Sequence, residues 1–200
     1  MQAAPSPTPA SAASRRSTLL DAAGGVFARY GYRKASMDEV ARAAGVSRQG
    51  LYLQFANKEE LFKESLVRWL SKQLQAAASA LSQPGASLES RLVAACDAWC
   101  GRFVGALGSD AADLMCASTS LAGATLALYE ARFELALTQA IAGSPLADFC
   151  TAAGLSAADL AAALHATARG LKQSSASRHA FAEGMTVTAR MFCAPLHQRI

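Results

Sequence analysis

Residues able to make specific polar contacts gather in the stretch "SRQGLYLQF", from Ser47 to Phe55. Arg48, Gln49 and Gln54 carry the guanidinium and amide groups that form bidentate hydrogen bonds with base edges in the major groove of DNA. Serine is a preferred N-cap residue, so a helix is predicted to begin at Ser47. Arg48 and Gln49 would then lie on the exposed first turn of that helix.

The preceding residues predict a second helix and a tight turn. Ser36 and Glu39 form a capping-box pattern at the start of "MDEVARAA". Gly45 follows, where the turn requires a left-handed residue. Two helices joined by a short glycine-containing turn form a helix-turn-helix. Their crossing needs one small residue, which is Ala41, and apolar residues that pack between the two helices. The sequence supplies these at Val40, Val46 and Leu51.

The basic charge of the chain is concentrated in its N-terminal part. The net charge of the 200 residues is +4, but residues 1–80 contain 11 Lys/Arg against 6 Asp/Glu, and residues 81–200 contain 8 against 9. This favours a nucleic-acid-binding end next to a different end, although ordinary surface scatter would look similar. Apolar residues make up 52% of the chain, which is enough to bury a core.

The chain is predicted to be all-α, with about nine helices and no sheet, because alanine is abundant and strand-like alternation is almost absent. The expected helices lie near residues 19–30, 37–44, 47–55, 57–74, 88–103, 110–122, 126–141, 160–171 and 181–192. We expect a left-handed Gly31 to end the first. The predicted organisation is a disordered tail (1–14), a helix-turn-helix domain (15–60) and a second domain (61–200).

Catalytic, metal-binding and membrane-spanning patterns are not found. The histidines at 165, 179 and 197 have no local partners for nucleophilic or metal chemistry, and the cysteines at 96, 100, 116, 150 and 193 form no Cys-x-x-Cys pair. No apolar run approaches the roughly 20 residues that a membrane helix needs. The Pro/Ser-rich start does not resemble a secretory signal. We therefore expect a cytoplasmic protein that is not an enzyme and has no cofactor.

Residues 19–62 resemble the N-terminal domain of the tetracycline-repressor (TetR-like) family of bacterial transcriptional regulators. The shared marks are "DAA…F…YGY", "S-x-x-x-V-A…AGVS", "LY-x-x-F" and "NKEELF". The rest of the chain is similar to the family only in length, helical content and Ala-rich style. The resemblance implies a homodimer whose first three helices bind operator DNA. It also implies a fourth helix leading to a ligand-binding core, and two last helices that pair with those of the second copy.

The resemblance also suggests site residues. The expected DNA-binding residues are Ser36, Ser47, Arg48, Gln49, Gly50, Tyr52, Leu53, Gln54 and Lys58. Arg48 and Gln49 would contact bases, whereas the hydroxyls of Ser36, Ser47 and Tyr52 and the ammonium of Lys58 would contact phosphates. The structural alternatives are that Tyr52 packs on the first helix and that Lys58 is merely solvated.

Two positions of the predicted third helix depart from the family pattern. Relatives often carry an aromatic residue and a histidine where this chain has Leu53 and Gln54, so we expect a different operator sequence. Leu53 can press on a thymine methyl group, and Gln54 can replace a phosphate contact. Gly50, which has no side chain, would let the backbone approach DNA closely.

Most members of the resembled family repress transcription until a small molecule enters the core. The candidate pocket residues are Cys96, Trp99, Cys100, Phe103, Met115, Tyr129, Phe133 and His165, each of which could instead be ordinary core. The expected dimer interface comprises Leu164, Leu171, Phe181, Met185, Thr188 and Phe192. The expected partners are therefore double-stranded operator DNA, a second copy of the chain and an unidentified effector.

Two other functions are compatible with the sequence. Cys96 and Cys100 are four residues apart and share a helix face, so they could form a thiol-based redox or metal sensor on the same scaffold. Free cysteine more often behaves as a small buried hydrophobe. The other alternative is a helical interaction module that does not bind DNA.

Overall fold

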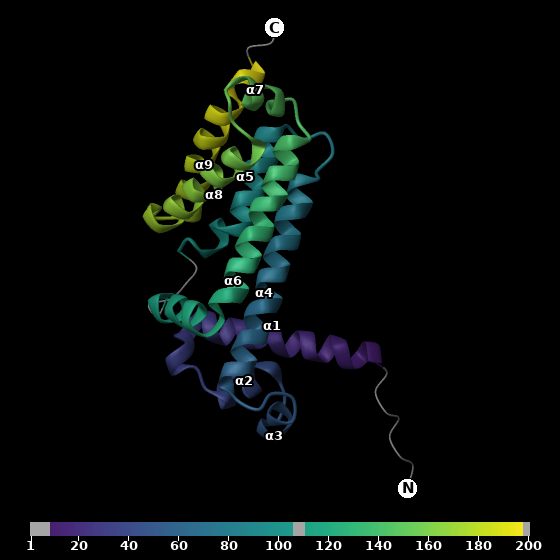
Figure 1. Cartoon of the computed structure of the whole chain (residues 1–200). Coiled ribbons are helices and arrows are strands. Elements are labelled where there is room, and N and C mark those ends of the chain that lie inside the picture. The colour runs from purple at the N-terminus through teal and green to yellow at the C-terminus, as the bar shows by residue number, and fades with distance from the viewer. Residues whose placement is uncertain (1–8, 106–110, 198–200) are drawn as a thin grey trace. The chain divides into compact units, whose positions relative to one another are not determined.

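The computed structural model describes residues 9–105 and 111–197. Over these ranges the chain contains nine α-helices, two short 3-10 helices and no strand (Figure 1). The α-helices are α1 (Pro9–Lys34), α2 (Met37–Ala44), α3 (Arg48–Tyr52), α4 (Lys58–Leu81), α5 (Leu88–Trp99), α6 (Ala111–Ala142), α7 (Leu146–Ala152), α8 (Ala157–Ser174) and α9 (Arg178–Cys193). The predicted all-α class is confirmed.

The chain divides into two compact units. Of the described residues, 9–70 and 111–123 form the N-terminal unit, and 71–105 and 124–197 form the C-terminal unit. Helices α4 and α6 each contribute to both units. The start of α6 thus joins the N-terminal unit, a feature that the predicted linear division at residue 60 does not include.

Serine begins several of these helices. The Oγ atoms of Ser36, Ser47, Ser87, Ser156 and Ser177 each accept a hydrogen bond from the backbone N–H three residues later. At Ser36 the carboxylate of Glu39 accepts from the serine N–H and Oγ–H in return, so the predicted capping box is confirmed. These hydrogen bonds lower the pKa of Glu39.

Helix α1 is longer than predicted and contains a kink. It begins at Pro9, inside the segment predicted as a tail, and continues through Gly31 to Lys34. Gly31 has φ 74° and ψ 176°, a combination essentially restricted to glycine, and not the left-handed helical conformation that we predicted. The chain therefore bends at Gly31 and resumes a last helical turn.

Further along the chain, the number of helices agrees with the prediction, but their bounds differ. Helix α5 ends at Trp99, and a 3-10 turn, Gly101–Phe103, replaces its expected last turn. The two helices predicted on either side of Gly123 are one helix, α6, kinked at Ala122 (φ −143°, ψ 27°). A glycine inside a helix costs only about 1 kcal/mol and does not have to end it. The short helix α7 was not predicted.

An aromatic cluster forms the core of the N-terminal unit. The Phe27 ring lies edge-on to the Phe62 ring at 5.1 Å, and the Tyr32 ring contacts Phe62 at 5.0 Å. Leu51 and Phe55, which flank the end of α3, are buried in the same cluster. Fixing α3 against α1 and α4 in this way determines which of its side chains remain exposed.

The C-terminal unit has its own aromatic core. The Trp99 and Phe133 rings stack at 5.0 Å, and the Phe133 ring meets the His165 imidazole at 5.2 Å. Helices α8 and α9 approach closely at Gly184, where an added Cβ would lie 2.9 Å from Leu171 Cδ2.

The described residues include no single helix that is both long and apolar enough to cross a bilayer, although the pair α7–α8, bent by 104°, meets the length and composition criteria jointly.

Candidate nucleic-acid interface

Helices α2 and α3 cross as a helix-turn-helix requires. Gly45 is left-handed (φ 66°, ψ 29°), and the Val46 N–H donates to Ala41 O at 3.0 Å across the turn. Val40, Ala41 and Leu51 are buried at the crossing, as predicted. Val46, the fourth residue expected at this crossing, is 36% exposed and contributes less.

Helix α3 is shorter than the predicted span of residues 47–55. It ends at Tyr52, and the Phe55 N–H then donates to Leu51 O at 3.0 Å in a turn. This turn buries Phe55 and leaves Leu53 81% exposed. The exposed side chains of this segment, all of them predicted DNA-binding residues, are Ser47, Arg48, Gln49, Tyr52, Leu53 and Gln54.

Arg48 connects the two helices of the motif. Its Nη1 atom lies 2.7 Å from Asp38 Oδ2 on α2, and its guanidinium lies over the Tyr52 ring at 5.6 Å. The Arg48 side chain is still 64% exposed. Asp38 was not predicted as a site residue, because its partner follows ten residues later across a turn and no local pattern links the two.

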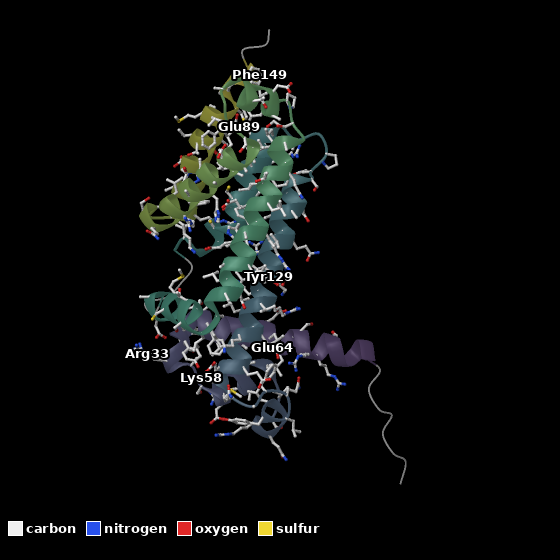
Figure 2. All side chains as sticks on the ribbon, viewed as in Figure 1. Arg33, Lys58, Glu64, Glu89, Tyr129 and Phe149 are labelled. Atoms are coloured by element: carbon white, nitrogen blue, oxygen red, sulfur yellow. The ribbon has the colours of Figure 1, made fainter. Side chains whose placement is uncertain are left out.

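Lys58 occupies a different environment from the one that the resemblance implies. Its Nζ donates to the backbone carbonyls of Tyr32 (2.9 Å), Ala35 (3.1 Å) and Arg33 (3.2 Å). It also lies 4.6 Å from the Tyr32 ring centroid. Figure 2 shows Lys58 near Arg33, which lies in the last turn of α1. An ammonium has three N–H donors, and all three have acceptors within the protein.

Ser36, a predicted phosphate contact, and Arg16, a basic residue of α1, are also engaged inside the unit. The Ser36 hydroxyl both donates to Glu39 Oε2 and accepts from the Glu39 N–H, so capping accounts for its position. Arg16 Nη2 lies 2.7 Å from both carboxylate oxygens of Glu64, and its guanidinium covers the Phe55 ring at 4.5 Å. Arg16 thereby holds α1 to α4.

Gly50 has an intramolecular role that the sequence did not indicate. Its N–H donates to Ser47 Oγ at 3.0 Å, and a Cβ at this position would lie 3.1 Å from the same oxygen. An added methyl group would push the serine hydroxyl off the first turn of α3.

We expect Gly50→Ala to weaken operator binding by less than about tenfold, because a lost N-cap costs about 1 kcal/mol. A fluorescence titration with labelled operator measures this. Ser47→Ala, which removes the cap without adding a side chain, is the matched control. If Gly50→Ala binds much more weakly than Ser47→Ala, close approach of the backbone to DNA explains the glycine better than the cap does.

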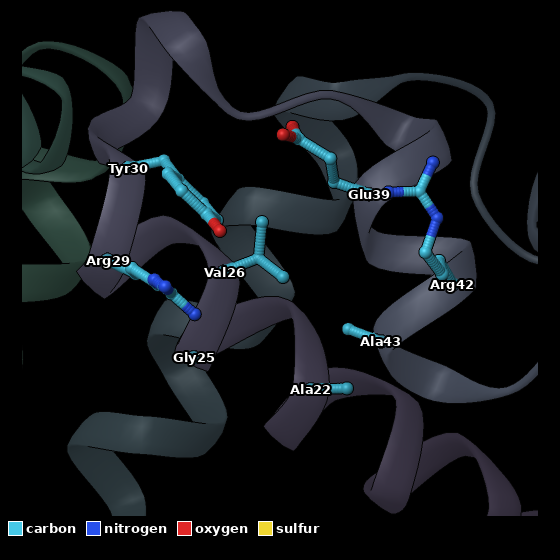
Figure 3. Close-up of a pocket in the computed structure, with 8 residues that line it drawn as sticks. All are labelled: Ala22, Gly25, Val26, Arg29, Tyr30, Glu39, Arg42 and Ala43. Atoms are coloured by element: carbon cyan, nitrogen blue, oxygen red, sulfur yellow. The ribbon is translucent and has the colours of Figure 1, made fainter.

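A shallow groove of about 390 Å³ lies between α1 and α2. Figure 3 shows Arg29 and Tyr30 of α1 on one side and Glu39 and Arg42 of α2 on the other. Glu39 is already used in the capping box. Because two arginines face one carboxylate, the groove carries a net positive charge beside the helix-turn-helix.

Most of the predicted pocket residues lie together in the C-terminal unit. Buried members are Cys96, Trp99, Cys100, Tyr129, Phe133 and His165. The prediction of Met115 as a pocket residue is wrong, because its side chain is 46% exposed and it lies in the part of α6 that belongs to the N-terminal unit. The Phe103 side chain lies outside the described residues.

His165 is the polar member of the buried face of α8. It is 3% exposed, and its Nδ1 atom lies 3.3 Å from Glu134 Oε2 on α6. Its Nε2 atom is buried and has no hydrogen-bond partner among the described residues.

The residues predicted for the dimer interface are partly unsuitable for it. Leu164, Phe181 and Met185 are completely buried inside the protomer and offer no surface to a second copy. Leu171, Thr188 and Phe192 are half-buried. The most exposed apolar side chains of α9 are instead Val187 (59%) and Met191 (71%), one turn apart. Helix α9 has two apolar pairs at helical spacing, Phe181–Met185 and Val187–Met191, so the sequence pattern alone could not show which pair is exposed.

The paired cysteines Cys96 and Cys100 are buried, and all five cysteines are free thiols. Burial raises the pKa of Cys100 to about 11 and raises the pKa of Cys96 still further. Among the described residues, no three His, Cys, Asp or Glu side chains converge as metal ligands.

Residues 19–65, about a quarter of the chain, match the family described as bacterial regulatory proteins, tetR family. The probable acrEF/envCD operon repressor of Escherichia coli is 37% identical over 65 residues, which are 32% of this chain and 28% of that protein. The transcriptional activator FasR of Mycolicibacterium smegmatis is 50% identical over 54 residues, 27% of this chain and 25% of FasR. These matches span about a third or less of the relatives' length.

A solved structure extends the likeness to nearly the whole fold. A transcriptional regulator from Rhodococcus sp. Rha1 superposes with a TM-score of 0.66, over 91% of this chain and 97% of that chain. The sequence identity is 22%, so this likeness concerns the fold alone. The sequence matches fall on the helix-turn-helix, and the C-terminal unit is similar only in architecture.

Proposed function

We propose that this chain, which belongs to the tetR family of bacterial regulatory proteins, acts in the cytoplasm as a homodimeric repressor that a small molecule releases from a near-palindromic operator. The observation that carries the DNA-binding part is the α2–α3 crossing. It buries the apolar side of α3 and leaves Arg48 and Gln49 exposed on its first turn. The first turns of a recognition helix are where base edges are contacted.

The polar groups of α3 divide into two proposed roles. Arg48 and Gln49 supply bidentate donors and acceptors for bases, and Leu53 supplies an apolar contact for a thymine methyl group. The hydroxyls of Ser47 and Tyr52 contact phosphates, and Gln54 does so from the turn after α3. Lys58 stabilises this surface indirectly, because its ammonium donates hydrogen bonds to the carbonyls of Tyr32 and Ala35, just before α2.

A mobility-shift assay and a footprint on the DNA upstream of the gene for this chain test the proposal. We expect one protected, near-palindromic site whose half-sites lie roughly 34–36 Å or a multiple apart, one for each copy. Complete absence of binding at low salt would exclude DNA recognition and favour the helical interaction module.

We propose that the two copies pair through the outer faces of α8 and α9. Val187 and Met191 project from α9, and the exposed face of α8 carries small residues, including Ala162, Ala166 and Gly170, that allow close helix approach. These outer residues replace the buried residues of the predicted interface.

We expect the double change Val187→Glu and Met191→Glu to convert the dimer into a monomer, because each carboxylate would be buried against apolar surface. Sedimentation analysis measures the mass. Leu128→Glu, at another exposed apolar site, is the matched control and should remain dimeric. A wild-type chain that is monomeric at micromolar concentration, or a double variant that still dimerises, would contradict this interface.

The small-molecule part of the proposal concerns the C-terminal unit. A ligand can shift the DNA-binding equilibrium only if it binds one arrangement of the dimer better than the other. Helices α4 and α6 contribute residues to both units, and we propose that they carry a change in the C-terminal unit to the N-terminal unit.

The thiol-sensor alternative receives less support from the chemistry of the cysteines. The thiolate is the reactive form, and burial keeps Cys96 and Cys100 protonated at neutral pH. With an aromatic disulfide reagent at pH 8, we expect the exposed Cys116 to react fast and the four buried thiols to react only after denaturation. Cys116→Ser should remove the fast phase. Fast reaction of Cys96 or Cys100 would instead support the thiol-sensor alternative.

A further inference from the structure

The imidazole of His165 is an unusual group to find in the apolar core of the C-terminal unit. It is 3% exposed, and its neighbours on the buried face of α8 are Ala161, Leu164 and Ala168. The Phe133 ring packs against the imidazole in an edge-to-face arrangement. Buried polar atoms in proteins nearly always have a hydrogen-bond partner, and leaving one without a partner is costly.

The partner of Nδ1 determines what Nε2 can do. Nδ1 lies 3.3 Å from the Glu134 carboxylate, which can only accept, so Nδ1 carries the proton. In the neutral ring Nε2 is then a bare acceptor. Since no described residue donates to it, the atom is complementary to an O–H or N–H donor from outside the chain.

A second buried atom with the same polarity belongs to this unit. Gln73 Oε1, on α4, also has no partner among the described residues, and it too is an acceptor. The buried Tyr129 hydroxyl of this unit, by contrast, has a hydrogen-bond partner, Ser71 Oγ, at 2.6 Å. The two orphaned atoms therefore both favour a hydrogen-bond donor and disfavour an anion.

We propose that the effector of this regulator is a neutral, mainly apolar molecule whose hydroxyl group donates a hydrogen bond to His165 Nε2. This inference deepens the proposed function and rests on its ligand-responsive part. The apolar body of the ligand packs against the Trp99–Phe133 aromatic stack. The Glu134 side chain is 42% exposed, so the hydrogen-bonded pair has one member in contact with solvent and one member, the imidazole, in the core.

Paired probes that differ only in the hydroxyl test the proposal. Full-length protein with Trp69→Phe retains Trp99 as its single tryptophan, whose stacking on Phe133 makes its emission a local reporter. Binding of either probe is followed at pH 8 by the change in this emission. We expect 4-ethylphenol to bind about tenfold or more tightly than 4-ethylanisole, the methyl ether of the same phenol.

Two variants test whether the preference for 4-ethylphenol over 4-ethylanisole depends on His165 Nε2. His165→Phe keeps an aromatic ring but removes the acceptor, so 4-ethylphenol should lose its advantage while 4-ethylanisole binds as before. His179→Phe, at an exposed histidine, is the control and should retain the advantage.

Several results would overturn the proposal. Equal binding of the two probes to the wild-type chain would mean that water satisfies Nε2. Tighter binding of 4-ethylbenzoate would mean an anionic ligand, and no binding of any probe at millimolar concentration would exclude the site. Operator binding without probes is measured separately. A chain that discriminates the probes but binds no DNA refutes only the DNA-binding function, and the converse result refutes only the ligand class.

Discussion

Replacing Lys58 by methionine is expected to lower the free energy of unfolding by about 2 kcal/mol, because hydrogen bonds to a charged group contribute about 1.5–3 kcal/mol and partial exposure reduces that. The variant keeps the aliphatic stem but leaves the carbonyls of Tyr32, Arg33 and Ala35 without their shared donor. These carbonyls belong to the segment that follows the Gly31 kink and leads into α2. Denaturant unfolding followed by circular dichroism measures the loss.

Lys63→Met is the matched control for this prediction. Lys63 is on the same helix and makes only an exposed ion pair with Glu59, four residues earlier, so its loss should cost under about 0.5 kcal/mol. The salt dependence of DNA binding separates the two roles of Lys58. A phosphate contact would make the slope shallower by about one in the variant. An unchanged stability together with that shallower slope would contradict the role that its three carbonyl partners indicate.

The second large effect is expected from Arg48→Ala combined with Gln49→Ala. Each bidentate base contact contributes about 1–3 kcal/mol of discrimination, so operator affinity should fall at least about fivefold per contact. Binding to unrelated DNA should change much less. Both side chains are exposed, and the Asp38 ion pair lost with Arg48 contributes at most about 1 kcal/mol, so the fold should persist. Competition footprinting with operator and random DNA measures the ratio.

Arg132→Ala is the control for the charge removed in that variant. Arg132 is an exposed arginine of α6 that lies over the Tyr129 ring, and it belongs to the other unit. Its removal should change operator affinity less than about twofold at physiological salt, where exposed charges are strongly screened. If the Arg48 and Gln49 changes weaken binding to all sequences equally, these residues bind the DNA backbone and the sequence preference comes from elsewhere.

The helix-turn-helix was predictable because its determinants are local. Ser36, Gly45 and Ser47 each act on backbone groups within four residues, so their types and spacing carry the geometry. The partners of Lys58 could not be predicted, since they lie 23 to 26 residues earlier and are backbone atoms of no particular sequence. The family resemblance supplied a role for this lysine that its contacts in the structure do not favour.

Helix faces were the weaker part of the prediction. Periodicity finds that α9 has an apolar stripe, but Phe181–Met185 and Val187–Met191 are both apolar pairs at helical spacing. Only the packed structure separates the buried pair from the exposed one. The kink at Ala122 and the exposed position of Met115 likewise leave no mark in the local sequence pattern.

The ion pair between Arg48 and Asp38 has a consequence for the search along the chromosome. On non-cognate DNA the guanidinium already has an internal anion, so it displaces no condensed cation from the duplex and adds nothing to the salt-dependent attraction. A matching guanine offers two acceptors that outcompete one carboxylate. If the chain recognises DNA as proposed, the pair weakens retention on the many non-cognate sequences and is exchanged only at a cognate site, so the protein dissociates faster from all other DNA.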